Sequence, residues 1–139
     1  MRVLNVVSIL ATREGAGNAE RTAQLTRAIQ SKDVSCSVLT LDIGRLEDRV
    51  ADIAGASLIV LPCLSIRFQI PRGGWRKVVD AVRDSDVIHL MGYWTVLGAM
   101  VYLAARLHRV PYVVSPAGAL PLFGRSRWLK RIYNLLVGR

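Results

Sequence analysis

The sequence predicts an α/β fold built on a doubly wound, mostly parallel β-sheet. Short apolar runs of strand length alternate with longer segments in which apolar residues recur at helical spacing. The apolar runs are also nearly continuous, as in strands that helices cover on both faces. A length of 139 residues fits one domain, so we expect a single domain over residues 1–139.

The first half of the chain contains three apolar runs and one clear helical pattern. Residues 3–9 are apolar at all but two positions, which predicts the first strand. A helix is expected at residues 19–31, with Asn18 as its N-cap. Further strands are expected at residues 34–41 and 56–61, and the charged segment between them carries at most one short helical turn.

The second half alternates in the same way. Residues 64–74 show no clear period and end in Pro71-Arg72-Gly73-Gly74, so this segment is expected to be a loop. The remaining elements are a helix at 75–84, a strand at 87–91, a helix at 95–108, a strand at 110–115, a loop at 116–124 and a helix at 126–137. Ligands of such sheets bind beyond the carboxyl ends of the strands, so residues 11–18, 92–94 and 116–124 should meet at one edge.

Two glycines stand between the first predicted strand and the first predicted helix. Gly15 and Gly17 would let the backbone approach a ligand closely, and the first amides of the helix would donate hydrogen bonds to an anion. A dinucleotide site is an alternative, although Glu20 replaces the third glycine of a G-x-G-x-x-G motif; Asp42 would bind the ribose. A turn that binds no ligand is a third possibility.

The net charge of +9 is concentrated toward the end of the chain, since residues 87–139 contain seven Lys and Arg and no acidic residue. The aromatic residues there form no stacking stripe, so we expect no nucleic-acid partner. Cys36 and Cys63 are too few and too far apart for a disulfide framework or a metal motif and are expected to be buried thiols. Such thiols indicate a reducing compartment, so we expect a cytoplasmic protein. The uncharged stretch 87–105 is about as long as a bilayer span, but it divides into a strand and a helix, which argues against a membrane span.

Three blocks follow one another along the chain: Gly15-Ala16-Gly17-Asn18-Ala19-Glu20-Arg21, Asp86-Val87-Ile88-His89-Leu90-Met91-Gly92-Tyr93-Trp94 and Pro111-Tyr112-Val113-Val114-Ser115-Pro116-Ala117-Gly118-Ala119-Leu120. In this order and spacing they resemble the N-terminal domain of family 4 glycosyltransferases. The resemblance implies a Rossmann-like domain that forms one half of a GT-B fold. Such enzymes transfer a sugar from a nucleotide-sugar to an acceptor, usually with retention of configuration and without a metal.

The resemblance implies a binding site with no catalytic residue, metal or cofactor in this half, the nucleotide-sugar being a co-substrate. The donor-phosphate loop would consist of Gly15, Ala16, Gly17 and Asn18. The acceptor side of the cleft would consist of Arg13, Glu20, His89, Gly92, Tyr93, Trp94, Pro116, Ala117 and Gly118. Met91 and Ala117 stand where family members commonly have histidines, so this half offers the reacting sugar fewer hydrogen bonds.

The resemblance also implies partners. A C-terminal domain would hold most of the donor, so we expect the chain alone to be inactive or weakly active. The acceptor would be a sugar or a lipid-linked saccharide, as in the synthesis of cell-surface polysaccharides. The last predicted helix is basic and suits an anionic membrane on its cytoplasmic face. Its contact residues would be Arg125, Arg127, Trp128, Lys130 and Arg131.

Overall fold

The computed structural model describes residues 1–117, 128, 131–132 and 134–135. Its centre is a five-stranded sheet of strand order β3-β2-β1-β6-β7, in which all neighbouring strands are parallel. The strands are β1 (Arg2–Val7), β2 (Ser35–Leu41), β3 (Ser57–Leu61), β6 (Val87–Met91) and β7 (Tyr112–Ser115). The predicted fold class is confirmed, and each strand lies within two residues of its predicted bounds.

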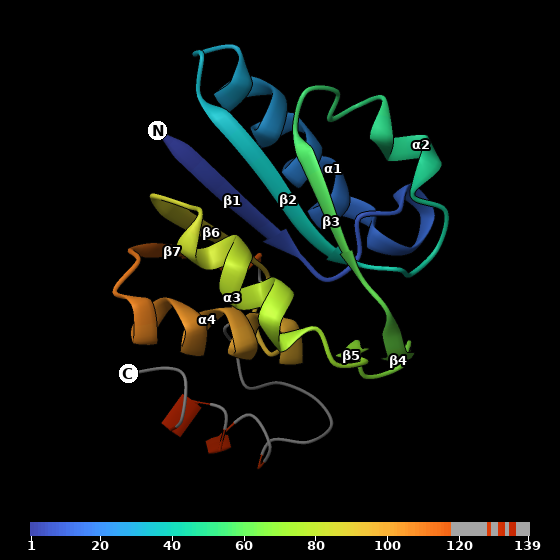
Figure 1. Ribbon diagram of the computed structural model, residues 1–139. Helices are drawn as coiled ribbons and strands as arrows, with labels where there is room; N and C mark the ends of the chain where they lie inside the picture. Colours follow the sequence, from blue (N-terminus) through green and yellow to red (C-terminus); the bar gives the residue numbers. More distant parts are fainter. Residues whose placement is uncertain (118–127, 129–130, 133, 136–139) are drawn as a thin grey trace.

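Helices cover both faces of the sheet (Figure 1). On one face lie α1 (Thr12–Gln30) and the single-turn α2 (Glu47–Val50); on the other, α3 (Trp75–Arg83) packs beside α4 (Val96–His108). Side chains alternate along a strand, so β1 contributes to two cores. Leu4 and Val6 pack on the side of α3 and α4, whereas Val7 packs with α1. This two-sided burial explains the continuous apolar runs of the strands.

The first helix differs from its prediction. It begins at Thr12, and Gly15, Ala16 and Gly17 lie inside its span. Ala16 has φ 41° and ψ −129°, so the helix consists of a first turn and a longer second part that meet at a kink. The first turn forms because the Gly15 amide donates a hydrogen bond to the carbonyl of Ala11 at 2.8 Å. The prediction of a glycine loop before the helix was therefore wrong.

The predicted N-cap role of Asn18 is also wrong. Ala11 occupies the N-cap position of α1 and makes no side-chain capping bond. The carbonyl of Asn18 lies within the helix and accepts a hydrogen bond from the Thr22 hydroxyl at 2.8 Å. By contrast, α4 has a side-chain cap, because Thr95 Oγ1 accepts a hydrogen bond from the Gly98 amide at 3.0 Å.

The segment expected to be a loop contains a small antiparallel hairpin, formed by β4 (Cys63–Ser65) and β5 (Ile70–Pro71). Two hydrogen bonds anchor its base. The Cys63 amide donates to Asp42 Oδ1 at 2.5 Å, and the Arg72 amide donates to the Pro62 carbonyl at 2.7 Å. The hairpin projects beyond the carboxyl end of β3 (Figure 1).

The remaining expectations concern thiols, membranes and the last helix. Cys36 is buried, which raises the pKa of its thiol, but Cys63 is only half-buried.

No helix within the described part of the chain is long and apolar enough to cross a membrane. Trp128, Arg131, Ile132, Asn134 and Leu135 are helical, in agreement with a helix at 126–137, and the other residues of that helix lie outside the described ones.

Gly15→Ala and Gly17→Ala form a matched pair that tests the packing at the kink. A Cβ at Gly15 would lie 2.4 Å from the Ile9 carbonyl oxygen, whereas a Cβ at Gly17 would meet nothing within 4 Å. We expect Gly15→Ala to lower the free energy of unfolding by about 1–3 kcal/mol. Gly17→Ala should leave it unchanged or raise it by up to about 1 kcal/mol. Urea unfolding followed by circular dichroism measures both, and equal stabilities would contradict the close approach at Gly15.

Candidate functional site

A cleft of about 420 Å³ lies at the carboxyl edge of the sheet. Its size is within the range of sites that bind small molecules. The end of β1, the first turns of α1, the β4–β5 hairpin and the segments that follow β6 and β7 line it. The lining residues are Val7, Ser8, Ile9, Glu14, Gly15, Asn18, Arg67, Phe68, Gln69, Met91, Gly92, Tyr93, Trp94, Thr95, Pro116 and Ala117.

The cleft brings together residues from all three sequence blocks. The first block contributes Gly15 and Asn18, the second contributes Gly92, Tyr93 and Trp94, and the third contributes Pro116 and Ala117. These segments follow β1, β6 and β7, which are adjacent in the sheet. Since the strands are parallel, their carboxyl ends share one edge, and residues distant in sequence meet there.

Three other predicted residues lie on α1 away from the cleft wall. Arg13, Ala16 and Gly17 are exposed and do not line it. The reason is the helical first turn, which presents Glu14 and Gly15 to the cleft instead of a loop whose whole backbone faces a ligand. Gly118 lies outside the described residues.

Glu20 does not line the cleft, and its partly exposed side chain pairs with a buried arginine. On its partner Arg49, Nη1 lies 2.7 Å from Glu20 Oε2 and 2.8 Å from Asp52 Oδ2, and the Arg49 side chain is 6% exposed. The hydrogen bond from Arg49 lowers the pKa of Glu20 below its ordinary range. Two carboxylates thus compensate one buried guanidinium, an arrangement that holds the α2 segment against α1.

His89 lies on β6 within the sheet and does not line the cleft. Its Nε2 is hydrogen-bonded to the Ser115 hydroxyl at 2.7 Å, and burial lowers the pKa of the imidazole. Asn5, its neighbour in register on β1, donates from Nδ2 to Thr26 Oγ1 of α1 at 2.9 Å. Within the described part of the chain, Asn5 Oδ1 and His89 Nδ1 have no hydrogen-bond partner. His89 is therefore a half-buried neutral group of the scaffold.

The chain turns sharply after β6, at the centre of the cleft. Gly92 has φ 94° and Trp94 has φ 60°, and the Gly92 amide donates to the Ser115 carbonyl at 2.8 Å. The rings of Tyr93 and Trp94 meet edge to face, with centroids 4.7 Å apart. A Cβ at Gly92 would lie 3.8 Å from Asn18 Nδ2. The turn thus brings the second block against the first.

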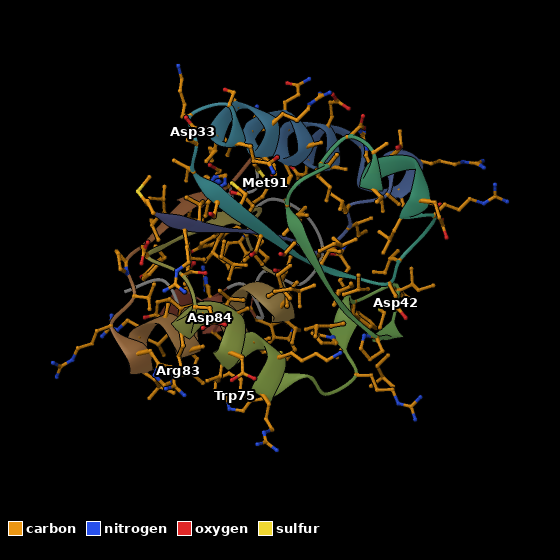
Figure 2. The ribbon with its side chains drawn as sticks, turned by 45° about the horizontal axis from the view of Figure 1, so that its top comes forward. Asp33, Asp42, Trp75, Arg83, Asp84 and Met91 are labelled. Carbon is orange, nitrogen blue, oxygen red and sulfur yellow. The ribbon has the colours of Figure 1, made fainter. Side chains whose placement is uncertain are left out.

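Met91 and Ala117, where the resemblance noted above leads one to expect histidines, lie on the cleft wall. Met91 is 5% exposed and belongs to the core cluster that contains Val7 of β1 and Ala23 of α1. Figure 2 shows Met91 beneath α1. This position therefore contributes packing, and neither residue has a side chain that donates a hydrogen bond to a sugar.

The sequence analysis missed the hairpin wall. Arg67, Phe68 and Gln69 line the cleft, and the Arg67 guanidinium lies over the Phe68 ring at 5.4 Å from its centroid. A signal was present: residues 64–68 alternate apolar and polar side chains, a strand period over five positions. The adjacent turn residues obscured it.

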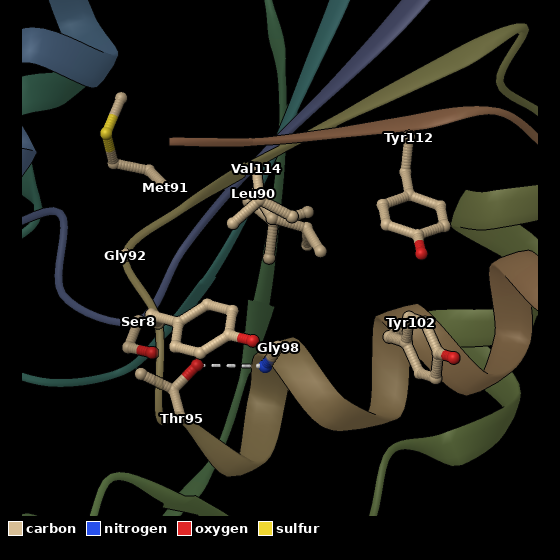
Figure 3. Close-up of a pocket in the computed structure, with 11 residues that line it drawn as sticks. Ser8, Leu90, Met91, Gly92, Thr95, Gly98, Tyr102, Tyr112 and Val114 are labelled. Atoms are coloured by element: carbon tan, nitrogen blue, oxygen red, sulfur yellow. Dashed lines mark hydrogen bonds between the residues drawn. The ribbon is translucent and has the colours of Figure 1, made fainter. Parts of the chain in front are cut away.

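A second cavity, of about 30 Å³, lies between the sheet and the start of α4 (Figure 3). Leu90, Val114 and the edge-to-face pair of Tyr102 and Tyr112 supply much of its wall. It shares residues such as Gly92 and Thr95 with the cleft. Its volume holds a water molecule or two, so the larger cleft is the candidate ligand site. Among the described residues, no group of three His, Cys, Asp or Glu could hold a metal ion.

Comparisons with known proteins bear on this site. The sequence model of a family described as "Glycosyl transferase 4-like domain" matches residues 16–139. No curated protein matches the sequence. A similar solved structure is the 2.2 Å crystal structure of a protein named as a UDP-N-acetylglucosamine 2-epimerase from Listeria monocytogenes, with 13% identity and a TM-score of 0.62. The match covers 99% of this chain but 35% of that one, and at this identity the likeness concerns the fold alone.

The buried imidazole predicts a pH dependence of stability. The pKa of His89 is lower in the folded state than its ordinary value of 6.5, so the unfolded chain binds more protons below that pH. Its contribution to the free energy of unfolding is present above pH 6.5 and is lost as the pH falls toward the folded pKa. His89→Gln should flatten the decline between about pH 7 and pH 5, measured by urea unfolding. The exposed His108 is the matched control: His108→Gln should keep the wild-type slope. The same slope in His89→Gln would contradict the assignment.

Proposed function

Because the chain belongs to the glycosyl transferase 4-like domain family, we propose that it is the acceptor-binding half of a nucleotide-sugar-dependent glycosyltransferase. One observation carries the proposal: residues of all three sequence blocks line a single cleft. The cleft lies where open parallel sheets bind their ligands. The proposed reaction transfers a sugar from a nucleotide-sugar to an acceptor held in this cleft.

The chemistry of the cleft wall supports a saccharide acceptor. Asn18 and Gln69 carry amides and Ser8 carries a hydroxyl, whereas Phe68 and Trp94 contribute aromatic surface. A sugar presents hydroxyl groups together with apolar C–H faces. Polar side chains placed beside aromatic surface fix the orientation of such a ligand.

The charge of the cleft supports a donor that is held mainly by a second domain. Among the described lining residues, Glu14 and Arg67 are the ones with a formal charge, so their charges cancel. A diphosphate is usually bound by several cations or by a row of backbone amides. Among the described lining residues, Arg67 is the one cation, which is too few to hold a diphosphate. A donor-binding domain would therefore complete the site, and the chain alone would have little or no transferase activity.

A dinucleotide-binding domain without transferase chemistry is the alternative. Two observations weigh against it. The glycines lie within the span of α1 instead of a loop between strand and helix. The Asp42 carboxylate accepts a hydrogen bond from the Cys63 amide and so anchors the hairpin, a role other than binding a ribose.

We further propose a place for the enzyme in the synthesis of cell-surface polysaccharides or lipid-linked saccharides, on the cytoplasmic face of a membrane. The basic last helix supports membrane attachment: Trp128 is 64% exposed and Arg131 is exposed. Arg125, Arg127 and Lys130 lie outside the described residues.

A ligand panel tests the acceptor assignment. We expect an alkyl hexoside, as a phosphate-free analogue of a saccharide acceptor, to raise the melting temperature of the chain more than UDP-sugars or NAD do. At 100 times Kd, a ligand of the folded state adds about 2.7 kcal/mol to the free energy of unfolding. Asn18→Ala and Gln69→Ala should each weaken acceptor binding by roughly 5- to 10-fold, since each removes a hydrogen bond worth about 1 kcal/mol.

The matched control for these variants is Gln24→Ala, because Gln24 is an exposed amide that bonds Glu20 on the surface of α1 and does not line the cleft. Its acceptor affinity should equal that of the wild type. Stabilisation by NAD alone, with no response to any saccharide, would support the dinucleotide alternative and overturn the acceptor assignment.

A further inference from the structure

The β4–β5 hairpin exposes a row of large apolar side chains. Leu64, Ile66 and Phe68 are 66%, 70% and 63% exposed, and they occupy alternate positions of the strand and its turn. Trp75 follows at the start of α3 and is 38% exposed (Figure 2). Exposed apolar clusters of this kind mark interaction surfaces in soluble domains, whereas single exposed residues do not.

Cations accompany this row along the chain, and the Arg67 guanidinium lies 5.4 Å from the centroid of the Phe68 ring. Arg67, Arg72, Arg76 and Lys77 are all exposed, and residues 53–79 contain no acidic residue. Asp42, at the base of the hairpin, already bonds the Cys63 amide, and the next acid along the chain is Asp80 on α3. We use the name hairpin surface for the apolar row Leu64, Ile66 and Phe68 together with these four cations.

We propose that the hairpin surface docks the protein onto an anionic lipid bilayer. The apolar row would enter the boundary between headgroups and acyl chains, and the cations would lie at the level of the anionic headgroups. Each Lys or Arg near such a membrane raises the affinity by about fivefold. The absence of acidic residues from residues 53–79 matches the charge of an anionic headgroup layer, and this complementarity favours the membrane as the occupant.

The anchoring of the hairpin supports this role. The bonds of Asp42 to the Cys63 amide and of the Arg72 amide to the Pro62 carbonyl hold its base to the end of the sheet. The apolar row is thus presented on a defined support and needs no separate folding step on binding. This surface is distinct from the basic last helix.

Docking through the hairpin would also set the position of the cleft. Arg67, Phe68 and Gln69 belong to the hairpin and line the cleft wall, so the cleft would open close to the bilayer surface. A lipid-linked acceptor could then enter it from the plane of the membrane. This consequence rests on the proposed function, whereas the docking itself does not.

Vesicle flotation of the whole chain tests the docking, with phosphatidylcholine vesicles compared to vesicles that contain phosphatidylglycerol. We expect binding to the anionic vesicles. Leu64→Ser/Ile66→Ser and Arg72→Glu/Lys77→Glu should each weaken it at least about tenfold. None of these four residues lines the cleft, and all are exposed, so the variants should keep the wild-type melting temperature.

Matched controls carry the same changes elsewhere. Leu103→Ser/Leu107→Ser alters two apolar residues of α4 that are 50% and 62% exposed, and Arg21→Glu/Arg83→Glu makes the same change in charge at exposed sites. Both controls should float like the wild type. Hydrogen exchange adds a local readout, since the amides of residues 64–69 should exchange more slowly on anionic vesicles.

Three results would overturn the proposal. The first is wild-type protein that stays unbound to anionic vesicles. The second is equal flotation of the wild type and the hairpin variants. In that case a triple variant of the predicted last helix, Arg127→Glu/Lys130→Glu/Arg131→Glu, would be tested, and loss of binding in it alone would assign docking to that helix. The third is a wild-type dimer that Leu64→Ser/Ile66→Ser converts to a monomer, which would make the surface a contact between two copies. Saccharide binding in the ligand panel is measured without vesicles, so its failure is distinguishable from a failure of docking.

Discussion

The pairing of β1 with β6 is the contact on which the site depends. Val7 at the end of β1 lies in register with Met91 at the end of β6, and β2 and β7 extend the sheet outward from this central pair. After β1 the chain enters α1 on one face of the sheet. After β6 it enters α4 on the other face. Such a reversal leaves a crevice at the carboxyl edge, because the two following segments turn away from each other. The cleft occupies this position, between residues 8–18 and residues 92–95.

The sequence predicted the sheet well because burial on both faces leaves a strong local signal. The run Val87–Met91 is almost wholly apolar, and its predicted and observed bounds are identical. The first turn of α1 could not be predicted in the same way. Gly15 has a low intrinsic helix propensity, and it is helical here because it fits against the Ile9 carbonyl and the Ala19 side chain. This fit is a tertiary contact, so the spacing of the glycines in the sequence cannot predict it.

The roles of polar residues in the site were equally difficult to predict from the sequence. The resemblance to family 4 glycosyltransferases predicts that Glu20 and His89 line the cleft. In the structure, Arg49 binds Glu20 and Ser115 binds His89, so both groups work inside the scaffold. The identity of the partner decides between the two roles. Both partners are far away in sequence, 29 and 26 positions respectively, and no local motif connects them.

The hairpin shows how much of the cleft comes from outside the three blocks. These blocks supply the wall formed by the sheet and α1, and this wall is nearly without charge apart from Glu14. Another part of the wall comes from residues 67–69 of the hairpin, whose base is held in part by the Asp42 carboxylate at the end of β2. One residue that resembles a ribose ligand in the sequence thus serves to position a wall of the cleft. An acceptor bound in the cleft would contact both the amide of Gln69 on the hairpin and the turn at Gly92. Its recognition would therefore depend as much on the hairpin as on the blocks that identify the family.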